Sequence, residues 1–369
     1  MKKIREKNTS SYDKKCLVAF AVTMLAVLLG AAGLVIYVDP FFHYHAPLKD
    51  FPYLVDNQLN QNPGMASHME YDSVMLGSSM TVNFNMDWFE ELLDLHTMKL
   101  SYSGAFPKDQ ANIMGKIFDS DNTIKKVFLG VDVITYMGDV EETKYPLPEY
   151  LYDDNVINDV SYLWNKDVLL NYILRPIADP DKTDLATVYA SWWTDDYYNI
   201  KWVMHNYVSP DKVEQETPAD AYIAGVEANL TENICPYIEA NPDTEFVIFF
   251  PPYSILFWND VLQENHLEAT MAEYKYLTNR LMEYENVSVY FFPDREDIIL
   301  DLNNYADYSH YHPQYNRFMT ECFADGSCRV ITEEEKTADD RGETIDEYLT
   351  HMRQIVADYD FEELFSKDY

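Results

Sequence analysis

The chain opens with a basic segment that is followed by a long uncharged, apolar stretch. Residues 1–15 hold six basic side chains and two acidic ones, and residues 16–38 hold no charged residue. A helix of that length, at about 1.5 Å per residue, reaches across the roughly 30 Å hydrocarbon layer of a bilayer. We therefore predict a membrane-spanning helix at 16–38 with the tail 1–15 in the cytoplasm, because basic residues favour that side.

Two other interpretations of the apolar stretch stay open. A helix buried in a soluble protein rarely stays uncharged over this length. A cleaved signal peptide normally has a shorter apolar core, and no small-x-small cleavage site follows this one. A membrane anchor is the reading that we expect, with everything after residue 38 outside the cytoplasm.

Beyond the apolar stretch, the pattern changes to a polar stalk and then to short apolar runs. Four prolines and several Asn and Gln residues between 39 and 70 predict the stalk. The runs that follow are continuously apolar rather than alternating, as in strands that are covered on both faces. They lie at 74–76, 98–100, 127–131, 246–250 and 287–292.

Helical patterns lie between these runs. Pro107 suits the first position of a helix whose buried stripe contains Ile113, Met114 and Ile117. We expect further helices at 218–240 and, as an acidic amphipathic tail, from about 332 to 366. Strands that alternate with helices predict an α/β fold, a three-layer, doubly wound parallel-sheet sandwich with its active groups at the carboxyl ends of the strands.

Residues 139–217 do not fit this alternation. They contain four of the six tryptophans, namely Trp164, Trp192, Trp193 and Trp202. We favour a helical insertion with its own aromatic core and some exposed rings; the alternative is a lid or a sugar-stacking platform over the active site.

The charge balance excludes one large class of function. With 63 acidic and 27 basic residues, the net charge is -36, or -40 without the +4 of residues 1–15. Such a chain is not expected to bind nucleic acid through its phosphates. The same charge would repel a polyanionic polymer, which favours a neutral glycan or an acyl-carrying membrane partner.

The cysteines give a weaker indication. Cys322 and Cys328 are close enough in sequence to close a short loop, and a disulfide and two free thiols are both open readings. Neither the cysteines nor the His-x-His pairs, at His43 with His45 and at His310 with His312, supply a full ligand set, so we expect no metal.

Only 11 glycines occur in 369 residues, so their positions are informative. Gly77, Gly104 and Gly130 each fall at the end of a predicted strand, where the backbone turns sharply. Ser78 and Ser79 follow Gly77 on what would be a strand-to-helix turn. A serine there either caps the helix or serves as a nucleophile above the sheet, with helix N–H groups beside it.

The far end of the chain favours the nucleophile. Asp307 precedes His310 by three residues, close enough for the carboxylate to hold the ring's Nδ1–H while Nε2 faces a serine. The order Ser, Asp, His along the chain is that of neither chymotrypsin nor subtilisin. His312, two residues further on, is a neighbour in the same loop and a rival for the role of base.

Together, the Gly-x-Ser turn ending at Ser79, the glycine at Gly104 and the Asp307-x-x-His310 pair resemble the SGNH (GDSL-type) hydrolase superfamily. The resemblance implies that Ser79 is the nucleophile, His310 the base and Asp307 the acid that orients it. It also implies an oxyanion hole made by the backbone N–H groups of Ser79 and Gly104. It covers roughly residues 70–320, so the domain 71–369 would be SGNH-like with 139–217 inserted.

One block departs from the family pattern. Where the family has Gly-x-Asn-Asp, this chain has Asp132 in place of the asparagine, and an ionised carboxylate accepts hydrogen bonds only. Loss of one oxyanion donor typically costs about 10²- to 10³-fold in rate. Asn83 and Asn85 are candidate replacements, and Asp132 itself has the alternative role of capping a turn.

The anchor and the Gly-Ser-Ser turn look most like the membrane-tethered branch of that superfamily, which includes the D-alanyl transfer protein of teichoic-acid modification and alginate O-acetylation proteins. This similarity implies acyl transfer or ester hydrolysis on an extracellular polysaccharide of the cell envelope, without cofactors. It also implies a multi-pass membrane acyltransferase as partner. The competing hypothesis is a non-catalytic scaffold that keeps the sandwich and holds a glycan or a membrane partner.

Overall fold

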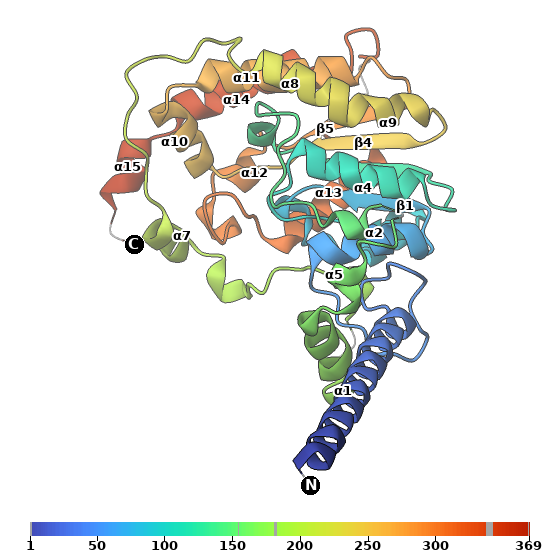
Figure 1. Ribbon diagram of the computed structural model, residues 1–369. Coiled ribbons are helices and arrows are strands. Elements are labelled where there is room, and N and C mark those ends of the chain that lie inside the picture. Colours follow the sequence, from blue (N-terminus) through green and yellow to red (C-terminus); the bar gives the residue numbers. More distant parts are fainter. Residues whose placement is uncertain (1, 154, 181–182, 337–341, 368) are drawn as a thin grey trace. The chain divides into compact units, whose positions relative to one another are not determined.

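The computed structural model describes residues 2–153, 155–180, 183–336, 342–367 and 369. The chain forms two compact units. One combines Met1–Met69 with Pro148–Thr183, and the other combines Glu70–Leu147 with Asp184–Tyr369. Figure 1 shows the elements of both.

The second unit is built on a parallel sheet of five strands in the order β2-β1-β3-β4-β5. All five predicted apolar runs are strands. They are β1 (Ser73–Leu76), β2 (Thr97–Lys99), β3 (Lys126–Gly130), β4 (Glu245–Phe250) and β5 (Val287–Phe291). Nearly every strand residue is buried, because helices cover both faces of the sheet (Figure 1). The predicted α/β class, a parallel sheet with flanking helices, is confirmed.

The strand order places a topological switch point between β1 and β3. From β1 the chain continues to β2 on one side, and from β3 it continues to β4 on the other. Connections that leave in opposite directions open a crevice at the carboxyl ends of the two strands. The residues that follow β1 and β3 therefore meet at that crevice.

The helices of this unit follow the predicted pattern in part. They are α3 (Asp87–Leu93), α4 (Pro107–Phe118), α7 (Ile200–Asn206), α8 (Ile223–Asn229), α9 (Cys235–Ala240), α10 (Ile255–Gln263), α11 (Leu267–Leu281), α12 (Glu296–Ile299), α13 (Pro313–Asp325), α14 (Ile345–Asp358) and α15 (Phe361–Ser366). Pro107 begins α4, as expected. The helix predicted for 218–240 begins only at Ile223. A π-helical turn, η7 (Leu230–Ile234), joins α8 to α9.

The helical tail expected from about 332 was placed too early. Among the described residues between 332 and 344, none is helical. Helix α14 begins after Thr344, whose side chain accepts from the N–H of Glu347 while the Glu347 carboxylate accepts from the N–H of Thr344. This capping box fixes the helix start at a position that the acidic composition did not indicate.

The first unit contains α1 (Lys2–Val38), α2 (Gln58–His68), α5 (Val160–Leu163), the π-helical η4 (Val168–Leu174) and α6 (Arg175–Ala178). Within α1, Tyr12–Val38 is long and apolar enough to cross a membrane, and an 18-residue window inside it has a mean hydropathy of 2.5. At its end, Asp39 has φ of +47° and its carboxylate accepts from the N–H groups of His43, Tyr44 and His45. The chain therefore turns sharply where the apolar helix stops.

The four tryptophans of 139–217 do not form an aromatic core. Trp164, Trp192 and Trp202 are exposed, and Trp193 is half-buried. The segment consists mainly of helical turns and loops, which are too short to enclose four indole rings. The tryptophans are surface features.

Candidate active site

The loop after β1 presents two serines with different environments. Gly77 has φ of +141°, and a Cβ there would lie 2.6 Å from Cγ2 of Thr81, so this tight turn requires glycine. The Oγ of Ser78 accepts from the N–H of Met80 at 3.2 Å and caps the 3-10 turn η1 (Ser79–Thr81). The Oγ of Ser79 takes no part in this cap.

The α-helix expected directly behind this serine is absent. Only the three-residue turn η1 follows Ser79, and α3 begins at Asp87. The N-terminal dipole of a long helix is therefore not available at Ser79. The N–H groups of Met80 and Thr81 are already bonded to Ser78, so the N–H of Ser79 is the candidate donor of this turn.

The structure brings together the three residues that the Gly-x-Ser and Asp-x-x-His motifs single out. His310 Nε2 lies 2.8 Å from Ser79 Oγ, and His310 Nδ1 lies 2.7 Å from Asp307 Oδ2. Because an ionised Asp307 only accepts, Nδ1 carries the ring proton and Nε2 is left to accept from the Ser79 hydroxyl. The hydroxyl of Tyr311 donates to the carbonyl of Met80 and ties the two loops together.

Asp307 is held in its ionised form. Its other oxygen, Oδ1, accepts from the backbone N–H groups of Ser309 at 2.8 Å and His310 at 2.7 Å. Burial opposes ionisation, but these bonds and the imidazole outweigh it and lower the pKa of Asp307 to about 2. At neutral pH this carboxylate fixes the position and tautomer of His310.

His312 takes no part in this chain of hydrogen bonds. It begins α13, where its ring accepts from the N–H of Gln314, and its Nε2 lies 3.4 Å from the exposed carboxylate of Asp195. Its ring packs against Tyr198. The geometry favours His310 over His312 as the base.

Asp132 lies two residues beyond β3, across the switch point from Ser79, and is buried. The hydroxyls of Tyr253 and Ser78 donate to its carboxylate. It begins the turn η2 (Val133–Thr135), but its side chain makes no capping bond there, so the capping role is wrong. Burial raises the pKa of Asp132, against the lowering effect of the two hydroxyls and of His310 nearby.

The other expected contributors are placed as follows. Gly104 has φ of +73° just after β2, and its N–H makes no hydrogen bond to any described residue. Asn83 is held through its Oδ1, which accepts from the N–H and the hydroxyl of Ser191. Asn85 Oδ1 accepts from the N–H of Asp87 in the next helix.

Two features beside the site were not found from the sequence. The side chain of Lys144 lies over Gly104, 3.0 to 3.2 Å from where a Cβ would be. The ring of Trp193 lies 5.0 Å from that of His310 and begins an aromatic series along the surface. The series continues through Trp192, Tyr197 and Trp202, in which neighbouring rings are 4.9 to 6.1 Å apart. The clustering of these residues in the sequence indicated an aromatic feature. Nothing in the sequence indicated that this feature lies beside His310.

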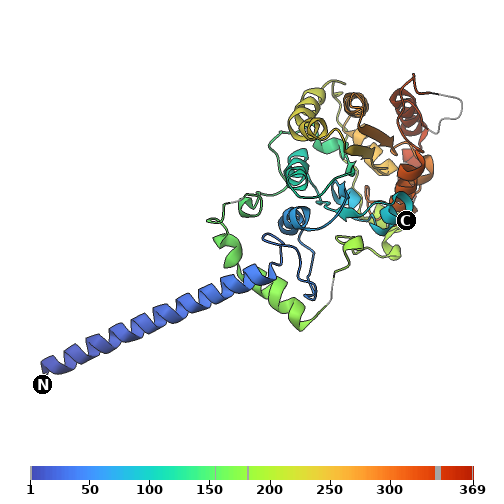
Figure 2. The same cartoon turned by 90° about the vertical axis from the view of Figure 1, so that its right-hand side faces the viewer.

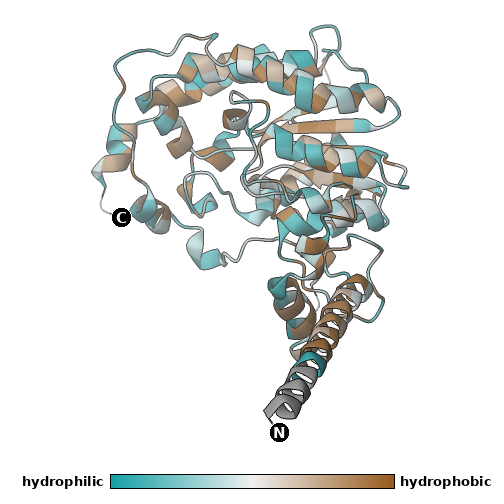
Figure 3. Ribbon diagram, in the orientation of Figure 1, coloured by the Kyte–Doolittle hydropathy of each residue, from teal (hydrophilic) through white to brown (hydrophobic). Residues whose placement is uncertain are grey.

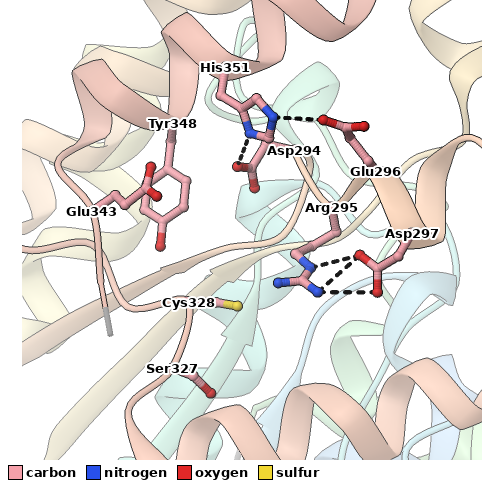
Figure 4. A pocket seen from close by; sticks show the side chains of 9 residues that line it. All are labelled: Asp294, Arg295, Glu296, Asp297, Ser327, Cys328, Glu343, Tyr348 and His351. Carbon is pink, nitrogen blue, oxygen red and sulfur yellow. Dashed lines mark hydrogen bonds and ion pairs between the residues drawn. The ribbon is translucent and has the colours of Figure 1, made fainter. Parts of the chain in front are cut away.

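A cavity of about 620 Å³ lies elsewhere in this unit, after β5 (Figure 4). Five of its charged or titratable side chains pair with one another, because His351 bonds Asp294 and Glu296 and Arg295 bonds Asp297, and Glu343 lies outside these pairs. It contains neither Ser79 nor His310 and has no free charge for a ligand among the paired groups. We assign it no role in the chemistry.

Cys328 lines that cavity and is not in a disulfide. Cys322 and Cys328 are both free and buried, with their thiols in hydrogen-bond contact. The sequence left open a disulfide or two free thiols, and in the structure the two thiols are free. Among the described residues, no group of three or more His, Cys, Asp or Glu side chains is arranged to hold a metal ion.

The similarity of this chain to known proteins is structural and distant. No family model matches the chain, and no curated protein matches it. Among solved structures, the chain is similar to one from Streptococcus pneumonia that is provisionally described as a platelet activating factor, with a TM-score of 0.38 and 11% identity. The match covers 72% of this chain and 88% of the other.

Proposed function

We propose that the protein is a serine esterase or O-acyltransferase of the SGNH type that is anchored in the cell membrane and acts outside the cytoplasm. The observation that carries the proposal is the pair of contacts at His310, with Ser79 Oγ on one nitrogen and Asp307 on the other. A hydroxyl, an imidazole and a half-buried carboxylate in that order are the parts of a nucleophilic acyl-transfer site.

The chemistry follows from these contacts. Nε2 of His310 takes the proton of Ser79 as Oγ attacks the acyl carbon, and Asp307 stabilises the imidazolium that forms. The N–H groups of Gly104 and Ser79 are the proposed donors to the oxyanion. His310 then protonates the leaving alcohol, which leaves an acyl group on Ser79. Water or a sugar hydroxyl, deprotonated by the same imidazole, removes the acyl group and regenerates the serine.

By the resemblance, Asp132 belongs to the sequence block that supplies the third donor of an SGNH site. Ionised, it supplies no hydrogen to an oxyanion. The buried position raises its pKa, so the protonated form, which has an O–H, is favoured more than for an exposed aspartate. We propose that Asp132 lowers the rate relative to the asparagine it replaces.

A glycan is the acyl acceptor or donor that the surface supports best. The exposed rings of Trp192 and Trp202 lie along a series that begins against His310. Aromatic rings offer a flat apolar face beside polar edges, which suits stacking on a sugar ring. The acidic composition favours a neutral glycan over a polyanionic one. A multi-pass membrane acyltransferase remains our proposed partner, on the resemblance alone.

The test is labelling of the purified full-length protein in detergent with a fluorescent fluorophosphonate. We expect labelling of the wild type, loss of labelling in Ser79→Ala, and unchanged labelling in Ser161→Ala, an exposed serine of the first unit. No labelling of folded wild-type protein would favour the second candidate, a non-catalytic scaffold. Circular dichroism on each sample establishes folding.

A further inference from the structure

The first unit carries a second apolar surface beside the anchor helix. Helix α1 packs against α5 and η4, as the blue helix and the green segment beside it show in Figures 1 and 2. The Nε1–H of Trp164, just after α5, donates to the carbonyl of Leu28 at 2.9 Å. Residues near 164 are therefore held against the interior of the apolar helix rather than against its end.

The depth of this contact follows from helix geometry. Leu28 lies ten residues before Val38, the last residue of α1, which at 1.5 Å per residue is about 15 Å along the helix axis. That distance is about half the thickness of the hydrocarbon layer. If α1 spans the bilayer and ends near its outer surface, then Trp164 lies at the level of the outer leaflet.

The side chains around Trp164 suit that depth. No charged residue occurs between 168 and 174, and Figure 3 shows the same brown, apolar colour on η4 as on α1. Five large apolar side chains on or next to α5, η4 and α6 are about half or more exposed: Val156, Ile157, Leu170, Leu174 and Ile177. In water this patch would carry an unfavourable hydration free energy, and in hydrocarbon it would not.

Charged residues bound the apolar stretch 168–174. Lys166 and Asp167 precede η4, and Arg175 follows it; all three are exposed. A long basic side chain reaches from the apolar layer to the headgroups. The indole N–H of Trp164, which has no water to bond at this depth, is satisfied by the Leu28 carbonyl.

We propose that residues 156–178 are embedded in the outer leaflet of the bilayer beside α1, so that the protein holds the membrane through a spanning helix and a second, half-inserted segment. Lipid is the occupant because the patch is continuous with the exposed apolar side chains of α1 at the same level. The inference rests on the membrane anchor of the proposed function and not on its chemistry. Two contacts fix the orientation of the first unit in the membrane plane, which a single helix does not.

The test uses site-directed spin labels on the full-length protein in phosphatidylcholine vesicles. The background is Cys16→Ser, because Cys16 is the exposed cysteine and Cys235, Cys322 and Cys328 are buried. The test position is Leu174→Cys, with Leu170→Cys in a separate sample. Collisions with oxygen, which partitions into lipid, are compared with collisions with a water-soluble nickel chelate.

Two positions calibrate the measurement. Leu25→Cys reports the exposed face of α1, and Val208→Cys reports a site that is 85% exposed in the other unit. We expect labels at 174 and 170 to resemble the label at 25, with an oxygen-to-nickel collision ratio several times that at 208.

Each other outcome overturns the inference. If the labels at positions 174 and 170 have the collision ratio of position 208 while the label at position 25 is in lipid, the patch lies in water. Labels shielded from both reagents and immobilised indicate a protein partner or a second copy in place of lipid. A spin label at position 25 with the collision ratio of position 208 would show that α1 itself is not in the membrane. Fluorophosphonate labelling of Ser79 tests the proposed chemistry independently of this result.

Discussion

Replacing Asp307 with asparagine removes one charge and leaves the shape of the site unchanged. Asp307 Oδ2 accepts the Nδ1–H of His310 at 2.7 Å. An amide NH₂ in that position can only donate, so the ring is driven to the tautomer in which Nδ1 accepts and Nε2 carries the proton. Nε2 would then donate to Ser79 Oγ, and the base would be unable to take the serine proton.

The structure gives the size of two effects. For activity, a triad held in the wrong tautomer loses about 10³- to 10⁴-fold in the acylation rate. For stability, lowering the pKa of Asp307 from 3.8 to about 2 corresponds to about 2 kcal/mol. Because the side chain is 32% exposed, we reduce this value to about 1 kcal/mol. A lowered pKa stabilises the fold above about pH 4, and this contribution is lost as the pH falls from about 4 to about 2.

The assay separates the two effects. We expect Asp307→Asn to lose most of its fluorophosphonate labelling rate and its hydrolysis of p-nitrophenyl acetate at pH 7. In urea unfolding it should be about 1 kcal/mol less stable than the wild type at pH 7 and nearly equal to it at pH 2. A folded Asp307→Asn protein that labels within about 10-fold of the wild-type rate would refute the tautomer argument.

Three further predictions follow from single residues. Asp132→Asn, which adds an N–H donor beside the oxyanion, should raise the hydrolysis rate of p-nitrophenyl acetate by up to about 10²-fold at pH 8; a slower enzyme would contradict a rate-lowering role for the carboxylate. Trp192→Ala should raise KM for an acylated oligosaccharide several-fold and leave kcat/KM for p-nitrophenyl acetate unchanged; an equal effect on both substrates would argue against stacking on sugar. Burial raises the pKa of Glu273 to about 9, so the fold loses stability as the pH rises from about 4.5 to about 9. Glu273→Gln should therefore add about 3 kcal/mol at pH 7 and flatten the pH dependence of urea unfolding, and a variant whose stability depends on pH as the wild type's does would exclude ionisation of Glu273 as the cause.

Much of the fold could be predicted because burial on both faces of a sheet leaves a local signature. Each strand is a short apolar run, and the residues that end the runs include Gly77 and Gly130, whose backbone must turn or approach another segment of the chain closely. Where the local signature was acidic composition alone, as before Thr344, the predicted helix began too early. Composition indicates that a segment is exposed and does not indicate where its first hydrogen bond forms.

By itself, the sequence determined the parallel α/β sheet, the long apolar helix and the two motifs that contain Ser79 and His310. These are properties of neighbouring residues, so spacing and hydropathy reveal them. Only the tertiary structure decided that Ser78 caps the turn while Ser79 faces His310, that Tyr253 holds Asp132, and that Trp193 lies against the imidazole. Contacts between residues that are more than a hundred positions apart depend on which strands are neighbours, and that order is set by the packing of the whole chain.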